Sequence, residues 1–333
     1  MIVLDADVLG RNRTGEETYL RNLLRELPAA APDFRFAAVT RRPDLVPEGV
    51  EPIALPARSQ ELRMAWSLPR LLRGLCPELA HFQHALPLGF RGRAVVTLHD
   101  LHFEHEPGVM GLADRLTFKV VVPRAARRAA HVLAVSERTK RDAVELYGLD
   151  PAKVTVTPHG VDPAFSPGDG GTGGFVLFVG AVQERKDPLA ALQAARENGL
   201  PLVVAGPEKE QRLAEELRRG GADVRGCVSQ DELVQLYRGA AALVLPSRHE
   251  GFGIPVIEAM ASGTPVVLSD DPALREVAGD AASYATGGDY GAALHTALAE
   301  RERLAAAGLE RAASFTWGET ARRTVDVYRR LLA

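Results

Sequence analysis

Short hydrophobic runs alternate with amphipathic helical patterns along the chain. In the first half, such runs predict five strands, at 2–4, 34–39, 79–82, 94–98 and 131–135. Leucines recur at helical spacing and predict a helix over 18–27, and a second helix is expected over 113–129. Ser136 precedes another helical pattern, so we expect it to cap a helix that runs to about Tyr147. This alternation is typical of a parallel α/β sheet.

The pattern breaks once and then restarts. Residues 158–174 are rich in proline and glycine and lack apolar periodicity, which is typical of a linker. Beyond them, five more strands are expected, at 175–179, 201–205, 223–225, 242–245 and 265–268. Asp187 and Pro188 predict the N-cap and first residue of a helix, and a last helix is expected from about Trp317 to Leu332.

Two domains are therefore expected. We place the first domain at 1–162, a linker at 163–174, the second domain at 175–316, and a helix that crosses back to the first domain at 317–333. Both domains have the strand and helix order of doubly wound, Rossmann-like sheets, whose ligands bind beyond the carboxyl ends of the strands. With two such domains facing each other, the cleft between them is the default position for a site.

The composition narrows the class of protein. Hydrophobic residues make up 46% of the chain and charged residues 25%, which fits a buried core rather than disorder. A net charge of −3 gives no reason to expect nucleic-acid binding. Cys76 and Cys227 lack metal-ligand spacing, and no run of about 18 apolar residues is present to span a bilayer. We therefore expect a cytoplasmic protein in a reducing compartment.

A loop in the second half carries two glycines ahead of a predicted helix. The strand at 242–245 leads into the polar loop 248–253, and the helix is expected to start around Pro255. The glycines let the backbone approach a ligand, and free N–H groups at a helix start favour an anion such as phosphate. Glu250 in the loop and Glu258 in the helix can accept hydrogen bonds from sugar hydroxyls. On these residues alone, an ordinary strand–loop–helix turn is an equally good interpretation.

The residues around this loop resemble a known family. Glu250 and Glu258 have seven residues between them, as in the Glu-x7-Glu motif of retaining glycosyltransferases with two Rossmann-like domains, the GT-B fold. The run 243–267 resembles glycosyltransferase family 4 throughout, and its mannosyltransferase-like subgroup most. The resemblance implies that Glu258 binds the ribose of a nucleotide and that Glu250 approaches the donor sugar. It also implies that the backbone amides of Gly251, Phe252 and Gly253 approach the sugar hydroxyls.

A pair of cations follows the strand at 175–179. Arg185 and Lys186 stand in a loop after Gly180 and before an expected helix. A departing nucleoside diphosphate needs positive charge near its phosphates, although an Arg-Lys pair by itself is more often a solvated surface. The pair resembles the Arg-Lys pair with which the family holds the donor diphosphate. The resemblance therefore assigns Arg185 and Lys186 to diphosphate binding and to catalysis.

A histidine closes a strand in the first half. The segment 97–100 contains His99 and resembles the family's His-Asp pair near the anomeric carbon, which implies that His99 helps to bind the donor sugar. A metal site is an alternative, because imidazoles are common ligands and further histidines lie close by, at His81, His84, His102 and His105. Retaining enzymes of this kind need no metal, because the Arg-Lys pair neutralises the diphosphate. We therefore expect neither a metal nor a cofactor.

The loop before the first helix departs from the family. Residues 14–19 resemble a Thr-Gly-x-Gly-x-Tyr start, whose glycines approach the donor phosphates or the acceptor. Here Glu17 replaces the second glycine and Glu16 precedes it. Two carboxylates would repel a phosphate unless they turn away, and acceptor hydroxyls are an alternative ligand for them. Only Gly15 keeps the family's assignment.

The resemblance implies a metal-independent hexosyltransferase of polysaccharide synthesis. It would transfer a sugar, best mannose from GDP-mannose, from a nucleotide sugar to a hydroxyl of a glycan or lipid-linked acceptor, with retention. UDP- and dTDP-sugars stay open as donors. His99, Glu250, Arg185 and Lys186 would act at the reacting end, while Glu258 holds the nucleotide. Peripheral contact with the anionic inner face of a membrane is a further expectation, from Trp66 and the arginines Arg63, Arg70, Arg73, Arg124, Arg127 and Arg128.

Three other functions are alternatives. A Rossmann oxidoreductase would need a Gly-x-Gly-x-x-Gly fingerprint after the first strand, which 9–15 does not supply. A phosphorylase-like or epimerase enzyme is the second alternative, and a phosphorylase would need a pyridoxal-bearing lysine late in the chain, whereas Lys209 is the last lysine. A non-catalytic binder with the same fold is the third, which the departure at Glu17 keeps open.

Overall fold

The computed structural model describes residues 1–11, 14–57, 59–105, 112–168 and 173–333, which form two compact units. The first unit comprises Met1–His159 and Trp317–Ala333, and the second comprises Gly160–Thr316. Residues 160–162, expected in the first domain, thus group with the second unit. In the expected linker, residues 169–172 lie outside the described residues, while Phe165 is buried against Tyr237 with ring centroids 5.7 Å apart. Part of that segment is therefore packed structure of the second unit.

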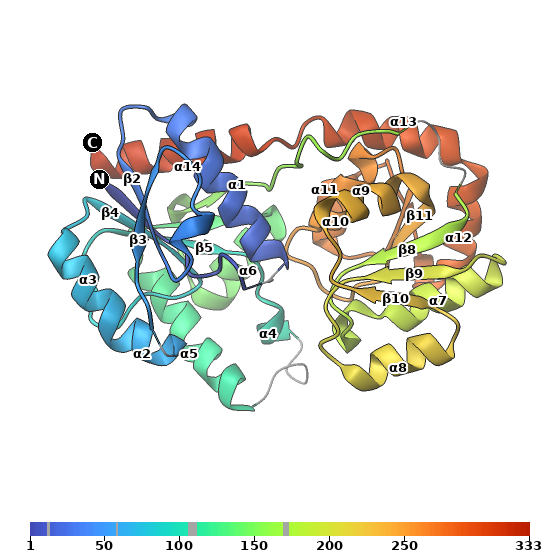
Figure 1. The fold of residues 1–333 in the computed structure, drawn as a ribbon, viewed down its shortest axis with the longest axis horizontal. Coiled ribbons are helices and arrows are strands. Elements are labelled where there is room, and N and C mark those ends of the chain that lie inside the picture. The colour runs from blue at the N-terminus through green and yellow to red at the C-terminus, as the bar shows by residue number, and fades with distance from the viewer. Residues whose placement is uncertain (12–13, 58, 106–111, 169–172) are drawn as a thin grey trace. The chain divides into compact units, whose positions relative to one another are not determined.

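Seven parallel strands form the sheet of the first unit, in the order β3-β2-β1-β4-β5-β6-β7 (Figure 1). The strands are β1 (Ile2–Asp5), β2 (Phe36–Thr40), β3 (Val50–Ala54), β4 (Leu79–Gln83), β5 (Ala94–Leu98), β6 (His131–Ala134) and β7 (Val154–Val156). Because β1 pairs with both β2 and β4, the strand order reverses beside β1. A doubly wound sheet presents its ligand-binding loops at the carboxyl ends of strands around such a reversal.

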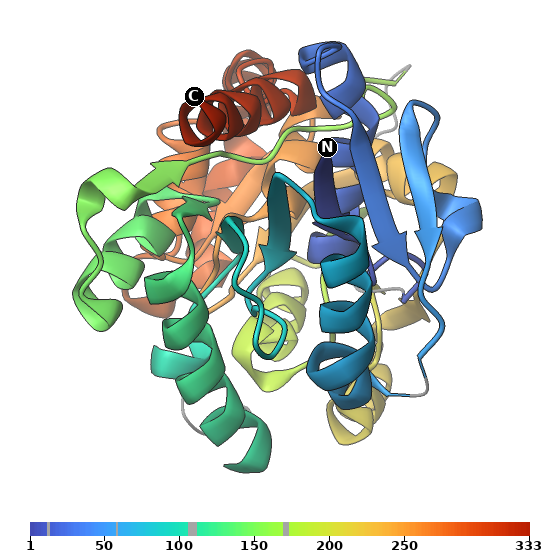
Figure 2. The ribbon, with the colours of Figure 1, turned by 90° about the vertical axis from the view of Figure 1, so that its left-hand side faces the viewer.

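Helices cover both faces of this sheet (Figure 2). They are α1 (Thr14–Ala30), α2 (Gln60–Leu62), the π-helical turn η2 (Arg63–Ser67), α3 (Leu68–Leu75), α4 (His102–His105), α5 (Leu112–Arg128), α6 (Glu137–Tyr147) and α14 (Trp317–Leu332), with the 3₁₀ turns η1 (Pro43–Leu45) and η3 (Pro151–Lys153). The expected cap of α6 is confirmed, because the Ser136 hydroxyl accepts a hydrogen bond from the Thr139 N–H at 3.1 Å.

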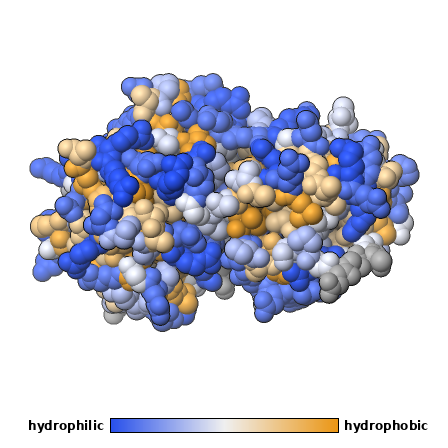
Figure 3. Space-filling model, turned by 90° about the horizontal axis from the view of Figure 1, so that it is seen from above, coloured by the Kyte–Doolittle hydropathy of each residue, from blue (hydrophilic) through white to orange (hydrophobic). Residues whose placement is uncertain are grey.

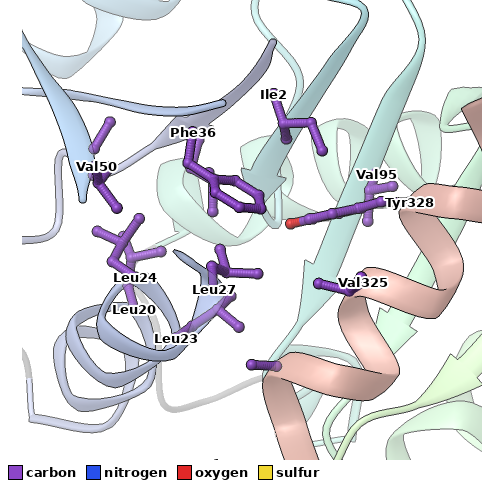
Figure 4. Packing of buried hydrophobic residues seen from close by; sticks show 14 of the residues in the cluster. Ile2, Leu20, Leu23, Leu24, Leu27, Phe36, Val50, Val95, Val325 and Tyr328 are labelled. Carbon is purple, nitrogen blue, oxygen red and sulfur yellow. The ribbon is translucent and has the colours of Figure 1, made fainter. Parts of the chain in front are cut away.

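Two hydrophobic clusters hold the first unit together, one on each face of the sheet. Side chains alternate along β5, so Val95 faces α1 and α14, whereas Val96 and Leu98 face α3, α5 and α6. Figure 4 shows the α1 leucines and the α14 side chains of Val325 and Tyr328 gathered with Ile2 and Phe36. The last helix of the chain is therefore part of the core of the first unit.

Six parallel strands form the sheet of the second unit, in the order β10-β9-β8-β11-β12-β13. The strands are β8 (Phe175–Val179), β9 (Leu202–Ala205), β10 (Asp223–Gly226), β11 (Ala240–Leu245), β12 (Val266–Leu268) and β13 (Ser283–Tyr284). Its helices are α7 (Pro188–Glu197), α8 (Gln211–Arg219), α9 (Gln230–Gly239), α10 (Ile254–Ala261), α11 (Pro272–Ala278), α12 (Tyr290–Ala299) and α13 (Arg301–Ala312), with the turns η4 (Glu184–Lys186) and η5 (Thr286–Gly288). The doubly wound α/β class expected for both halves is confirmed.

Three strands were missed by the hydrophobic pattern, and all three lie at the outer edge of a sheet. These are β3, β7 and β13. In β3 only Val50 is buried, and Pro52 interrupts its hydrogen-bonding capacity, which an edge strand tolerates. The strands β7 and β13 are short, with three and two residues. A strand that is buried on one side only, or that is very short, has too few apolar residues for a hydrophobic run to reveal it in the sequence.

The helices and the surface were compared with what insertion into a membrane requires. Across the described part of the chain, none of the helices combines the length and apolar character needed to cross a bilayer. On the face shown in Figure 3, hydrophilic residues predominate and hydrophobic ones form small patches among them.

Candidate functional site

The loop between β11 and α10 depends on glycine. β11 lies inside the second sheet, between β8 and β12. Its chain then runs through 246–252 to Gly253, the N-cap of α10, whose φ of 100° is left-handed. A larger residue would be strained by this backbone, and its Cβ would lie 2.7 Å from the Leu274 side chain, which would have to shift. α10 begins at Ile254, one position before the expected Pro255.

Glu258 lies in α10 and is almost completely buried. The Tyr237 hydroxyl donates a hydrogen bond to its Oε2 at 2.9 Å. Burial raises the pKa of Glu258 to about 8, with a smaller contribution from Asp162 and an opposing one from Tyr237. The raised pKa therefore favours the neutral carboxyl at pH 7. Tyr237 was not foreseen, because an α9 tyrosine carries no motif of its own.

Arg185 and Lys186 lie in the turn η4 after β8, and both contact the β11 loop. Lys186 forms an ion pair with Glu250, and Arg185 donates a hydrogen bond to the backbone carbonyl of His249. The Arg248 N–H in turn donates to the Arg185 carbonyl at 3.0 Å. Because β8 and β11 are hydrogen-bonded neighbours, their following loops meet at one edge of the sheet.

The charge of Glu250 is set by these cations. Burial opposes its ionisation, but Lys186 and Arg185 outweigh that effect and hold the pKa of Glu250 below its ordinary value. Glu250 and Glu258 therefore differ in charge at neutral pH, although both are buried glutamates of one motif. The first is an ionised, paired carboxylate, and the second is a neutral hydrogen-bonded carboxyl.

Asp187 confirms one local prediction, because Pro188 follows it as the first residue of α7. It occupies the N-cap position of α7, as expected, but its side chain makes no capping hydrogen bond. Its backbone is left-handed, with φ of 48°, a conformation that aspartate and asparagine tolerate better than most residues. Asp187 therefore suits this position because it tolerates the left-handed backbone, and not because its side chain caps α7.

The Phe252 side chain serves the core of the second unit. It is 4% exposed and meets the Phe315 ring edge-on, with centroids 5.7 Å apart. Any contact of Phe252 with a sugar would therefore use its backbone, as expected. The described structure leaves the ligand contacts of Gly251, Phe252 and Gly253 as predictions.

In the first unit, His99 follows β5 at the carboxyl edge of the sheet. Its Nε2 lies 2.8 Å from Gln83 Oε1 at the end of β4. The Tyr19 ring meets it edge-on at 4.8 Å, and His159 stacks on it at 5.8 Å. Burial lowers the pKa of His99 to about 4, assisted by His84, so the imidazole is neutral at pH 7.

The other histidines of this region turn to separate protein partners. His81 is fully buried, and its two ring nitrogens contact the Tyr328 hydroxyl at 2.6 Å and the Thr97 hydroxyl at 2.7 Å. His84 faces Glu16, while His102 contacts Asp100 and His105 contacts Asp142. Each of these histidines therefore has its own polar partner in the first unit.

The two glutamates of the first loop turn in different directions. Glu17 is buried, and its Oε1 accepts hydrogen bonds from the Gly10 N–H at 2.9 Å and from Arg21 at 2.8 Å. Glu16 is partly exposed and lies 3.4 Å from His84 Nε2. Gly15 is in the first turn of α1 with open space around it. Residues 12–13, which precede it, lie outside the described residues.

Among the expected membrane-facing arginines, Arg63 is a correction. Its side chain is fully buried and donates to Asp5 Oδ2 at 3.0 Å, with Asp7 close by. Two aspartates at the carboxyl end of β1 thus neutralise it within the fold. Arg70 and Arg73, by contrast, are exposed.

Comparisons with known proteins place these features in a family. A D-inositol 3-phosphate glycosyltransferase of Kineococcus radiotolerans is 34% identical over 265 residues, which is 66% of this chain and 60% of that protein. An O-antigen chain mannosyltransferase B of Escherichia coli is 27% identical over 274 residues, 72% of this chain and 71% of that protein. A solved structure of sucrose-phosphate synthase from Thermosynechococcus elongatus has the same fold, with a TM-score of 0.81, 20% identity and coverage of 99% of this chain and 98% of that one.

The family models divide between the two halves of the chain. Residues 13–165 match the model described as Glycosyltransferase Family 4, and residues 165–303 match the model described as Glycosyl transferases group 1. The two matches together run from residue 13 to residue 303, and they meet near the boundary between the two units. The chain therefore belongs to glycosyltransferase family 4 and has the GT-B fold, with two Rossmann-like units.

Proposed function

We propose that this protein is a retaining glycosyltransferase that moves a sugar from a nucleotide-diphosphate sugar to an acceptor hydroxyl. The observation that carries the proposal is the joining of Arg185 and Lys186 to the Glu250 loop at the carboxyl ends of two neighbouring strands. Two cations fixed at this edge suit a diphosphate, whose negative charge grows as the bond to the sugar breaks. Glu258, in the helix after the same loop, suits the ribose.

Each of the four residues Lys186, Glu250, Arg185 and His99 has a separate role in the proposed reaction. Lys186 leaves Glu250 for the diphosphate when the donor binds, and Glu250 then accepts hydrogen bonds from the sugar. Arg185 neutralises the departing diphosphate, and the neutral imidazole of His99 acts on the donor sugar near its anomeric carbon. The leaving diphosphate takes the proton of the acceptor hydroxyl on the same face of the sugar, so the protein itself contributes positioning and charge stabilisation. With the diphosphate neutralised by side chains, no metal is required.

GDP-mannose is the proposed donor, and a glycan or a lipid-linked sugar is the proposed acceptor. The similarity to a protein named as an O-antigen chain mannosyltransferase supports mannose and a polysaccharide product. The relatives named as D-inositol 3-phosphate glycosyltransferases show that another acceptor class occurs among similar chains. UDP- and dTDP-sugars stay as alternative donors.

Thermal-shift measurements with GDP, UDP and dTDP test the donor, each with and without EDTA. A ligand present at about 100 times its Kd stabilises the folded state by about 2.7 kcal/mol. We expect the largest shift with GDP and no loss of that shift in EDTA. Stabilisation by none of the three nucleotides would contradict the proposed function, and a shift abolished by EDTA would contradict metal independence.

Retention is tested on the product itself. With GDP-α-mannose as donor, the ¹H NMR spectrum of freshly formed product is expected to show the α configuration, whether the sugar passes to an added acceptor or to water. A β product would show inversion and remove the front-face mechanism from the proposal.

A surface of the first unit suits an anionic membrane. Leu62, Trp66 and Leu88 are 58%, 69% and 69% exposed, and the Leu88 N–H donates to the Met64 carbonyl at 2.9 Å, which places these side chains in one region. Exposed Arg70 and Arg73 on α3 supply positive charge beside them. We propose that this region rests on a bilayer rich in anionic lipids.

Co-sedimentation with phosphatidylglycerol vesicles tests this contact. The change of Trp66→Ala together with Leu62→Ser is expected to reduce the bound fraction severalfold, and neutral phosphatidylcholine vesicles are expected to bind less wild-type protein. Leu146→Ser is the control, because Leu146 is an exposed leucine of α6 outside this region. Equal binding by the double variant and the control would contradict the proposal.

A further inference from the structure

Glu16 presents a carboxylate at the carboxyl edge of the first sheet. It lies in the first turn of α1, its side chain is 34% exposed, and its Oε1 is 3.4 Å from His84 Nε2. Burial disfavours the charged form of His84, but the hydrogen bond and the charge of Glu16 outweigh burial and raise the pKa of His84 above its ordinary value. The two side chains therefore form an ion pair that is still open to solvent on the side of the carboxylate.

His84 is held in a demanding conformation beside His99. Its backbone φ is 57°, one of three left-handed non-glycine residues in the described chain. Its N–H donates to the Thr97 carbonyl at 3.0 Å, and its ring lies 5.3 Å from that of His99. Strained backbone persists where surrounding contacts enforce it, and it occurs often at ligand sites. Because β4 and β5 are neighbours, their ends bring His84 and His99 together.

Two carboxylates lie close to His84. Asp100 is a second partly exposed carboxylate at the same edge, close enough to act on the charges of both Glu16 and His84. Burial lowers the pKa of His99 to about 4, whereas Glu16 raises that of His84, and Asp100 also contacts His102 at 2.6 Å. Carboxylates accept hydrogen bonds from hydroxyl groups and repel phosphate.

Glu17 shows what a structural glutamate does in the same helix turn. It is buried and bound to the Gly10 N–H and Arg21, so it closes the loop on itself. Glu16 instead keeps an exposed carboxylate beside His84 and His99. The departure from a glycine-type loop thus produces one loop-stabilising residue and one residue available to a ligand.

We propose that Glu16 and His84 form a hydroxyl-binding subsite, which takes a pair of neighbouring hydroxyls of a neutral sugar or polyol and disfavours a phosphate in the same place. The assignment of this subsite to the acceptor rests on the sugar transfer proposed above. In that reaction, the subsite selects an acceptor whose reacting end is uncharged. Glu16 then determines specificity, and His84 fixes the direction of its carboxylate.

Two neutral probes and one phosphorylated probe test the subsite on the full chain. The neutral probes are myo-inositol and methyl α-D-mannopyranoside, and the phosphorylated probe is D-inositol 3-phosphate. Ring signals of ¹⁵N-labelled histidines report binding near His84 and His99 directly. In the wild type, a neutral probe is expected to shift these signals, with affinity about tenfold higher than that of the phosphorylated probe, a difference of about 1.4 kcal/mol.

Three variants complete the test. Glu16→Gln is expected to bring the two affinities within about twofold of each other, since it removes the repelling charge. His84→Asn tolerates the left-handed backbone and is expected to abolish the shift of the His99 signals. Glu26→Gln is the control, because Glu26 is another glutamate of α1 with a similar side-chain exposure of 32%; it is expected to behave as wild type.

Three results would overturn the inference. These are unshifted signals with both neutral probes, equal or tighter binding of the phosphorylated probe by the wild type, or identical affinities in wild type and Glu16→Gln. Nucleotide binding is measured on the same samples by thermal shift. Loss of the nucleotide response would contradict the proposed glycosyl transfer, whereas the histidine titration bears on the hydroxyl subsite alone.

Discussion

Glu258 is a carboxyl whose charge depends on its ligand state. Buried in α10 and hydrogen-bonded by Tyr237, it has a pKa raised to about 8. Ribose hydroxyls donate hydrogen bonds, and they bind an ionised carboxylate better than a neutral carboxyl. If Glu258 holds the ribose, nucleotide binding has to be coupled to loss of this proton.

The coupling predicts a pH dependence of nucleotide affinity. Raising the pH from 6 to about 8 ionises Glu258, so the affinity for GDP is expected to rise over this range and to level off above it. Calorimetric titration at several pH values measures the effect. Glu258→Gln is expected to bind more weakly and with a flatter profile, while the phosphates of GDP titrate equally in both proteins. Parallel profiles would count against Glu258 as the ribose ligand.

Lys186 has a structural role as well as a proposed catalytic one. It compensates the buried carboxylate of Glu250. Lys186→Met is therefore expected to cost about 3–5 kcal/mol of stability, because a buried charge loses its partner. The double variant Lys186→Met with Glu250→Gln is expected to recover most of that stability, as measured by urea unfolding.

Turnover separates the two roles of Lys186. Donor hydrolysis or transfer is expected to be about 10²–10³-fold slower in the double variant than in Glu250→Gln alone, because only the double variant lacks the cation at the diphosphate. A double variant that folds well and turns over at the wild-type rate would remove Lys186 from the diphosphate site.

At the scale of single residues, the sequence indicated which side chains to examine but not how they pair. Arg185, Lys186, Glu250 and Glu258 stood out through motifs. The pairing of Lys186 with Glu250 requires β8 and β11 to be neighbours, which no local pattern contains. Tyr237 and Gln83 contact the key side chains through tertiary packing alone.

Among the elements, the loops that end β8 and β9 are unusually close. Gly206 has φ of 147°, and a Cβ there would lie 2.0 Å from the carbonyl oxygen of Gly180. Arg185 and Lys186 follow Gly180 in the same loop. The close backbone contact therefore fixes the start of the loop that carries both cations.

Gly206→Ala is expected to push these loops apart. We expect a loss of more than about 2 kcal/mol of stability and a weaker affinity for nucleotide. The control is Gly221→Ala, since Gly221 also has a positive φ, 85°, but open space around it; its strain alone should cost about 1–2 kcal/mol. Urea unfolding and calorimetric titration compare the two, and equal effects would argue against the loop contact.

Most strands were predictable where burial was complete, although the exposed edge strand β10 was also predicted. The central strands of both sheets have continuous apolar runs, so their positions were found to within two residues. The edge strands β3, β7 and β13 have few buried positions, and their pairing depends on the neighbouring strand. Helix α14 was placed correctly because Trp317 and the later apolar residues repeat at helical spacing.

At the scale of the whole molecule, the two units have separate hydrophobic cores. The clusters around β1 and β5 belong to the first unit, and the cluster around β8 and β9 belongs to the second. Calorimetry is therefore expected to show two unfolding transitions. GDP should raise the transition of the second unit, which contains Glu258.

Tyr328→Ala distinguishes the two transitions. Tyr328 is fully buried in the first unit and contacts His81, so its truncation is expected to cost about 3–5 kcal/mol there. Only the transition of the first unit should move to lower temperature. A single transition that shifts as a whole, in the variant and with GDP alike, would show that the units unfold together.

The position of α14 has a consequence for how the protein is made. The first unit lacks one wall of its core until residues 317–333 have been synthesised, although its other elements leave the ribosome first. The apolar side of α1 is therefore uncovered while the entire second unit is being translated. Premature termination anywhere in the second half would destabilise the first unit, although residues 1–159 had already been made, and a chaperone that shields α1 would act during that interval.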